Sequence, residues 1–238
     1  MSWTDVPWGK VVGRSALLLG VAGLALTGVF LAVLNVDPAD PYSELAAAAR
    51  HPAAYRLAAF LDMAVWIGIG AVLLAFGGYF AARAPVRALV LAALGASQAV
   101  GALGGALRLG ALTDLAARYA GAAPDQQMVL GQSFLTIGQV ISSHYGLGQW
   151  LYGMGYLVIA SLAFAHSGTP RWIALWFGVA GIYSVANQVS VVAVGALLPG
   201  LLFLVFSLVQ DLVALVLAVT WWRGAPVQSA RVAPAPAV

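Results

Sequence analysis

Polar and ionisable side chains interrupt several of the most apolar stretches of this sequence. A carboxylate, a guanidinium or an imidazole in such a setting can form an ion pair, hold a ligand or transfer a proton. A charge at the centre of a membrane span costs about 2.5–3.5 kcal/mol on insertion scales, so these side chains must face protein and have partners. Seven residues define the candidate ligand pocket: Asp62, Arg108, His144, Gln149, Asn187, Gln188 and Asp211.

The elements that must position these residues are long apolar segments. The chain has 238 residues, of which 62% are hydrophobic and 8% are charged, whereas a soluble domain carries about 25% charged residues. A span needs about 20 mostly apolar residues, and it must be helical because lipid satisfies no backbone polar groups. We therefore expect an all-α polytopic transmembrane bundle over residues 1–222, with six spans at about 12–36, 57–81, 88–109, 145–165, 172–198 and 201–222.

The segments between the predicted spans differ in kind. Residues 37–55 are acidic, and their middle, Ser43–Arg50, predicts a short surface helix with Ser43 as its cap. Before the fourth span, four polar residues recur at helical spacing: Gln132, Thr136, Gln139 and Ser143. The opposite face is apolar, which predicts an amphipathic helix on the membrane surface or tucked into the bundle. Residues 223–238 are rich in Ala, Pro and Val and predict a disordered cytoplasmic tail.

The distribution of Lys and Arg favours one orientation of the six spans. Short cytoplasmic loops of membrane proteins are enriched in these two residues. One set of ends and connections carries Lys10, Arg14, Arg83, Arg87, Arg171, Arg223 and Arg231. The other set carries the acidic residues Asp37, Asp40, Glu44, Asp114 and Asp125, which are offset by Arg50, Arg56 and Arg118. We therefore expect a multi-pass protein of the cell membrane with both termini in the cytoplasm.

Depth along each span places the candidate residues at similar levels. At about 1.5 Å per residue, Asp62 lies about 9 Å below the outer end of the second span. Arg108 lies near the outer end of the third span, on the same face as Gly101 and Gly105. The other candidates fall in the outer halves of the last three spans, and Asp211, near the middle of the sixth, is the deepest. These depths predict an outward-facing polar pocket in which Asp62 and Arg108 form an ion pair.

Each candidate residue also has a purely structural interpretation. Arg108 can extend to the outer interface, and Asp62 can be its partner without any ligand. Asn187 and Gln188 can form hydrogen bonds between helices, which contribute about 0.6 kcal/mol on average. Asp211 is the hardest to explain in this way, because no basic residue lies at its depth. It is either protonated or in contact with a polar neighbour.

The sequence lacks the motifs of several common classes of functional site. It contains no Cys, which excludes disulfides and thiolate metal sites. It contains no HExxH motif, no phosphate-binding loop and no GxSxG motif. Its three His do not provide the pair at matching depth that a haem bridging two helices needs. We expect no cofactor, no metal and no catalytic residue, and the net charge of +3 gives no basic face for nucleic acid.

Three classes of function remain open. The first is a non-enzymatic protein whose pocket binds a small polar or amphipathic ligand, or a lipid. The second is an accessory subunit that binds another membrane protein through helix faces of small residues. The third is a membrane enzyme that acts on a lipid, with His144 and Asp62 as acid and base. The lipid bilayer is the expected partner in all three.

Two regions of the sequence resemble a known family. The run HPAAYRLAAFLD at residues 51–62 is similar to the start of the second span in a bacterial membrane family known as domain of unknown function 4386. The run HYG at residues 144–146, and the run PRW at residues 170–172 that follows Ser167 and Gly168, resemble its fourth and fifth spans. The resemblance covers roughly residues 12–212 in span order and loop lengths. It implies a multi-pass protein of the bacterial inner membrane and supplies no substrate.

Overall fold

The computed structural model describes residues 6–36, 40, 42–166, 169–194 and 200–223. Its helices follow one another as α1 Trp8–Val29, η2 Phe30–Leu34, α2 Ser43–Arg50, α3 Pro52–Phe80, α4 Pro85–Ser97, α5 Ala99–Leu107, η3 Arg108–Leu112, α6 Thr113–Ala120, α7 Pro124–Ala165, α8 Arg171–Val194 and α9 Gly200–Trp221. Within this described part, six helical stretches are long and apolar enough to cross a membrane. The expected all-α bundle of six membrane-spanning helices is confirmed.

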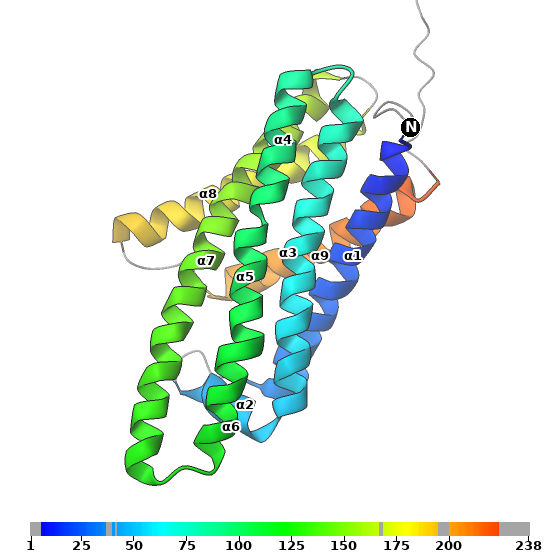
Figure 1. Cartoon of the computed structure of the whole chain (residues 1–238). Helices are drawn as coiled ribbons and strands as arrows, with labels where there is room; N and C mark the ends of the chain where they lie inside the picture. The colour runs from blue at the N-terminus through cyan, green and yellow to red at the C-terminus, as the bar shows by residue number, and fades with distance from the viewer. Residues whose placement is uncertain (1–5, 37–39, 41, 167–168, 195–199, 224–238) are drawn as a thin grey trace, which may run out of the picture.

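The helix α3 packs between α1 on one side and α4 and α5 on the other. α1 contacts both α3 and α9, while α3 also contacts α4 and α5, and α8 packs mainly on α7. Figure 1 shows that α8 and α9 cross the other long helices obliquely. The start of α1 and the turn between α3 and α4 lie at one end of the bundle, and α2 and α6 lie together at the other.

The helix α7 is longer than a single span requires. Its 42 residues extend about 63 Å at ~1.5 Å per residue, about twice the ~30 Å hydrocarbon core of a bilayer. The amphipathic segment expected before the fourth span is helical, but it continues into that span without a break, because no Pro interrupts the segment. Phe134 and Ile141 are buried on its apolar face. The first half of α7 therefore projects beyond the membrane-spanning part of the bundle.

The third span also continues past the expected end near residue 109. It runs from Pro85 to Ala120 through α4, α5, η3 and α6. η3 is a π-helical turn that begins at Arg108, and the hydroxyl of Thr113 donates a hydrogen bond to the Arg108 carbonyl at 3.2 Å. Single π-turns within α-helices are frequent at functional sites. A second one, η2, ends the first span.

The short helix α2 has the bounds that the sequence predicts, but not the expected surface position. Leu45, Ala47 and Ala48 are buried, so α2 packs into the end of the bundle. The residue at its cap position is Tyr42 rather than Ser43. Several other expectations fall on residues outside the described part: Asp37, residues 167–168, the end of the fifth span at 195–198, and the tail at 224–238.

Candidate ligand pocket

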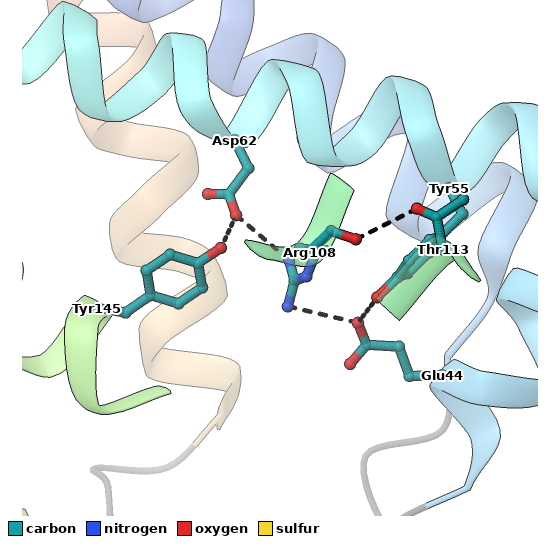
Figure 2. Close-up of polar contacts among 6 residues, drawn as sticks. All are labelled: Glu44, Tyr55, Asp62, Arg108, Thr113 and Tyr145. Atoms are coloured by element: carbon teal, nitrogen blue, oxygen red, sulfur yellow. Dashed lines mark hydrogen bonds and ion pairs between the residues drawn. The ribbon is translucent and has the colours of Figure 1, made fainter. Parts of the chain in front are cut away.

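The side chain of Arg108 lies at the centre of the polar residues in the bundle. Its Nη1 lies 3.3 Å from Oδ2 of Asp62 on α3, and its Nη2 lies 3.4 Å from Oε1 of Glu44 on α2. Figure 2 shows the guanidinium between these two carboxylates. The Arg108 side chain is only 15% exposed, and that of Asp62 only 10%. One cation thus joins two acidic residues that come from different helices.

Two tyrosines complete the hydrogen bonds of these carboxylates. The hydroxyl of Tyr55 donates to Oε1 of Glu44 at 2.7 Å. The hydroxyl of Tyr145 on α7 donates to Oδ2 of Asp62. Each carboxylate therefore contacts both the guanidinium and a phenol, as Figure 2 shows. Such paired contacts are what a buried charge requires, because a carboxylate without partners in this environment is strongly disfavoured.

Aromatic rings enclose the rest of the Arg108 guanidinium. Its Cζ lies 5.7 Å from the ring centre of Phe30 in η2 and 5.6 Å from that of Tyr145. A cation within about 6 Å of a ring face is attracted by the ring quadrupole. Arg108 thereby links η2, α2, α3 and α7 to the third span. Its Nε is buried and has no hydrogen-bond partner among the described residues.

A cavity of about 420 Å³ lies beside this network, between α1, α3, α7 and α9. It is lined by Gly23, Leu26, Thr27, Phe30, Leu31, Asp62, Val65, Trp66, Ile69, Arg108, Tyr145, Gln149, Tyr152, Leu204, Phe206, Ser207, Gln210 and Asp211. Leu31 is 57% exposed, so the cavity reaches the molecular surface near the C-terminal end of the first span. A mostly apolar wall with a few convergent polar groups is typical of a small-molecule site.

The indole of Trp66 forms part of the cavity wall, and two glycines make room for it. A Cβ added at Gly101 on α5 or at Gly148 on α7 would overlap the indole ring. The ring centre of Trp66 lies 5.5 Å from that of Tyr145, with the two rings stacked, and 6.0 Å from that of Tyr152. The small-residue face expected on the third span therefore serves to seat an aromatic side chain of α3.

Asp211 on α9 is the second carboxylate of the cavity. The residue is only 4% exposed. Its carboxylate lies against α1 at Gly23, where an added Cβ would overlap the carboxylate oxygens. Within the described ranges, it forms no hydrogen bond and no ion pair. The structure thus brings Asp211 to the same cavity as Asp62 and Arg108, but leaves it outside their network.

A group of three amide side chains lies behind the cavity wall. Asn187 Nδ2 and Gln188 Nε2, both on α8, donate to Oε1 of Gln149 at 3.2 Å and 2.5 Å. Gln149 lines the cavity and is 8% exposed. Its own Nε2 is buried and has no hydrogen-bond partner in the described part of the chain. The two α8 amides therefore hold Gln149 in place, and one donor of Gln149 stays unused.

The structure brings together most, but not all, of the residues that the sequence singles out. Four of the seven candidates line the cavity: Asp62, Arg108, Gln149 and Asp211. Asn187 and Gln188 lie behind Gln149 and do not line it. His144 is partly exposed and does not line the cavity either, and its Nδ1 lies 2.7 Å from the Val140 carbonyl of its own helix. The imidazole and the Asp62 carboxylate therefore share no contact in the described structure.

Sequence reasoning missed the residues that connect the candidates. Glu44 lies in a segment that reads as a surface helix, and Tyr145 is the immediate neighbour of His144. A usable signal exists for Tyr55, because it precedes Asp62 by two helical turns and so shares its face of α3. No three His, Cys, Asp or Glu side chains come close enough to hold a metal ion within the ranges described.

Comparison with known proteins supports the same overall assignment. The chain matches the model of the domain of unknown function DUF4386 over residues 11–224. No curated protein and no solved structure matches it. Because the matched region includes all six membrane-spanning helices, this multi-pass helical protein belongs to the DUF4386 family.

Proposed function

We propose that the protein binds a small polar or amphipathic ligand within the membrane, in the cavity that Asp62, Arg108 and Asp211 line. The observation that carries this proposal is the coincidence of these three charged side chains with an aromatic wall in one cavity of about 420 Å³. Ligand pockets commonly measure about 300–1,000 Å³. A cluster that served only to join helices would not need a cavity beside it.

The proposed orientation places this cavity in the extracytoplasmic half of an inner-membrane protein. Lys10, Arg14, Arg83 and Arg87 lie toward one end of the bundle, where α1 begins and α3 meets α4. The network of Arg108 and Glu44 lies toward the opposite end, beside α2. Under the positive-inside rule, the Lys- and Arg-rich end faces the cytoplasm. A ligand would then enter from the outer side or from the outer leaflet.

A ligand screen with matched variants tests this function. The full chain, purified in a non-ionic detergent, is screened against small polar and amphipathic compounds by thermal shift. Asp62→Asn and Asp211→Asn change the cavity, whereas Asp114→Asn changes an exposed carboxylate that pairs with Arg118 on α6. We expect at least one compound to stabilise the wild type and Asp114→Asn, but not the two cavity variants. If no compound distinguishes these proteins, the cavity has a structural role only.

A second candidate function is that of an accessory subunit of a larger membrane complex. The observation that favours it is the projecting first half of α7, where Met128 is 70% and Val129 is 65% exposed. Extraction of the tagged chain from its native membrane in a mild detergent tests this candidate. A stoichiometric membrane-protein partner, lost when Met128 and Val129 are changed to Gln, supports it. A monodisperse single chain argues against it.

The enzyme alternative gains little from the geometry. His144 and Asp62 would have to act on the same lipid, yet only Asp62 lines the cavity. Asp62 is also held by Arg108 and Tyr145, which both bind its Oδ2. An assay on lipid extracts in which His144→Ala abolishes a turnover that the wild type shows would revive this alternative.

A further inference from the structure

The charges of the cavity lining do not balance. Asp62 and Asp211 carry its carboxylates, and Arg108 is its single cation among the described residues. The two terminal nitrogens of Arg108 already contact Asp62 and Glu44. Asp211 therefore has no counter-charge among the described residues, although only 4% of its surface is exposed. A buried carboxylate without a counter-ion needs a positive group or a proton.

The polar contacts of the cavity disfavour an anionic ligand. An anion would have to compete with Glu44 and Asp62 for the guanidinium of Arg108, and it would face Asp211 across the cavity. A neutral ligand would compensate Asp211 only if the carboxylate took up a proton. A ligand with one positive charge satisfies Asp211 and disturbs neither of the existing ion pairs. Charge complementarity thus selects the sign of the ligand.

The walls of the cavity suit a cation that carries an apolar chain. Trp66, Tyr152 and Phe206 present aromatic rings, which attract ammonium groups. Leu31 and Leu204 line the cavity from the first and last spans, and Leu31 is more than half exposed. An alkyl chain can follow these leucines toward lipid while the head group stays inside. The close approach of α1 at Gly23 holds the Asp211 carboxylate in place at the α1–α9 contact.

From these features we propose that the cavity binds a monocationic amphiphile, an alkylammonium, whose positive group pairs with Asp211 and whose chain leaves between η2 and α9. This inference rests on the proposed ligand-binding function and narrows it to one class of compound. It assigns Asp211 as the residue that recognises the charge, and Arg108 with Asp62 as a fixed wall. The inference also predicts that binding requires Gly23, because a glycine at this position leaves space for the Asp211 carboxylate.

The test uses three probes with one chain length and three head groups. Octylammonium, octanol and octanoate are titrated into the purified full chain in a non-ionic detergent, and binding is followed by thermal shift and calorimetry. We expect saturable stabilisation by octylammonium, and none by octanol or octanoate. Asp211→Asn should weaken its binding by at least about tenfold, the factor expected for a lost charge-assisted hydrogen bond. Asp114→Asn should bind like the wild type, which controls for uptake of the amphiphile by micelles.

A second variant keeps the test informative if Asp211→Asn does not fold. Gly23→Ala retains the carboxylate but displaces it, so it should also weaken octylammonium binding. Unchanged binding of octylammonium to a folded Asp211→Asn protein overturns the inference, as does stabilisation by sodium chloride that depends on Asp211. Preference for octanoate or octanol overturns the inference but leaves the ligand-binding function standing. If none of the three probes binds, the inference fails, and the broader screen decides the proposed function.

Discussion

Asp62 on α3 accepts a hydrogen bond from Tyr145 on α7 through the same Oδ2 atom that lies 3.3 Å from Nη1 of Arg108. Three spans therefore meet at one carboxylate oxygen. Glu44 repeats this arrangement nearer the end of the bundle, with Tyr55 as its phenol. The network joins α2 and the first four spans without any contribution from α8 or α9. Substitutions in this network therefore change the side of the cavity that the first four spans form, and not the side formed by α9.

Removal of the central cation should strongly destabilise the fold. Arg108→Gln leaves Glu44 and Asp62 buried without a counter-charge, and the loss of one partner of a buried ion pair costs about 3–5 kcal/mol. Thermal unfolding in detergent measures the change. Arg118→Gln provides the control, since its side chain is 67% exposed and pairs only with Asp114 on the surface of α6. Similar stability of the two variants would contradict a structural role of the Arg108 network.

The neighbours Tyr145 and His144 should differ in their contribution to stability. Tyr145→Phe removes the hydroxyl that donates to Asp62 but keeps the ring that contacts Arg108 and Trp66. A hydrogen bond to a charged group contributes about 1.5–3 kcal/mol, and Arg108 still pairs with the same oxygen in the variant. His144→Ala removes an imidazole that contacts only a carbonyl of its own helix, so its effect should be smaller. The free energy of unfolding of both variants decides which residue belongs to the site.

The two glycines Gly148 and Gly138 provide a matched pair on α7. Gly148→Ala should force the Trp66 indole out of its place, at about 1–3 kcal/mol, as overpacking of a filled core typically does. A Cβ added at Gly138 would meet no atom of another described element within 4 Å. Gly138→Ala should therefore be neutral or stabilising by up to about 1 kcal/mol, because Ala favours the helix. Unfolding of both variants is measured in one detergent. Equal destabilisation by the two substitutions would contradict the close packing of Trp66 against Gly148.

The orientation can be tested with single cysteines, because the natural sequence has none. Asp114→Cys lies on exposed α6 at one end of the bundle, and Arg83→Cys lies in the turn between α3 and α4 at the other. A membrane-impermeant maleimide added to intact spheroplasts should label Asp114→Cys only. Both should react after the cells are broken. Labelling of Arg83→Cys alone in spheroplasts would reverse the proposed orientation.

The number of spans and the depth of the charged residues could be predicted from the sequence. Hydropathy sets both quantities, because lipid penalises every unsatisfied polar group and each residue adds a constant rise along a helix. Asp62 and Arg108 are found in this way, since two charges at one depth have few alternatives to pairing. The amphipathic segment before the fourth span was also predictable as a helix, because its polar residues recur at helical spacing. Its position was not, since the side chains that Phe134 and Ile141 pack against come from other helices.

Which side chains meet could not be predicted from the sequence. Contact across helices depends on their rotation and tilt, and the π-turn at Arg108 shifts the register of the third span by one residue. The rotation of α7 about its own axis turns Tyr145, and not its neighbour His144, toward Asp62. The packing of α2 into the end of the bundle brings Glu44 to Arg108. The position of Asp211 against Gly23 follows for the same reason from the packing of α9 on α1.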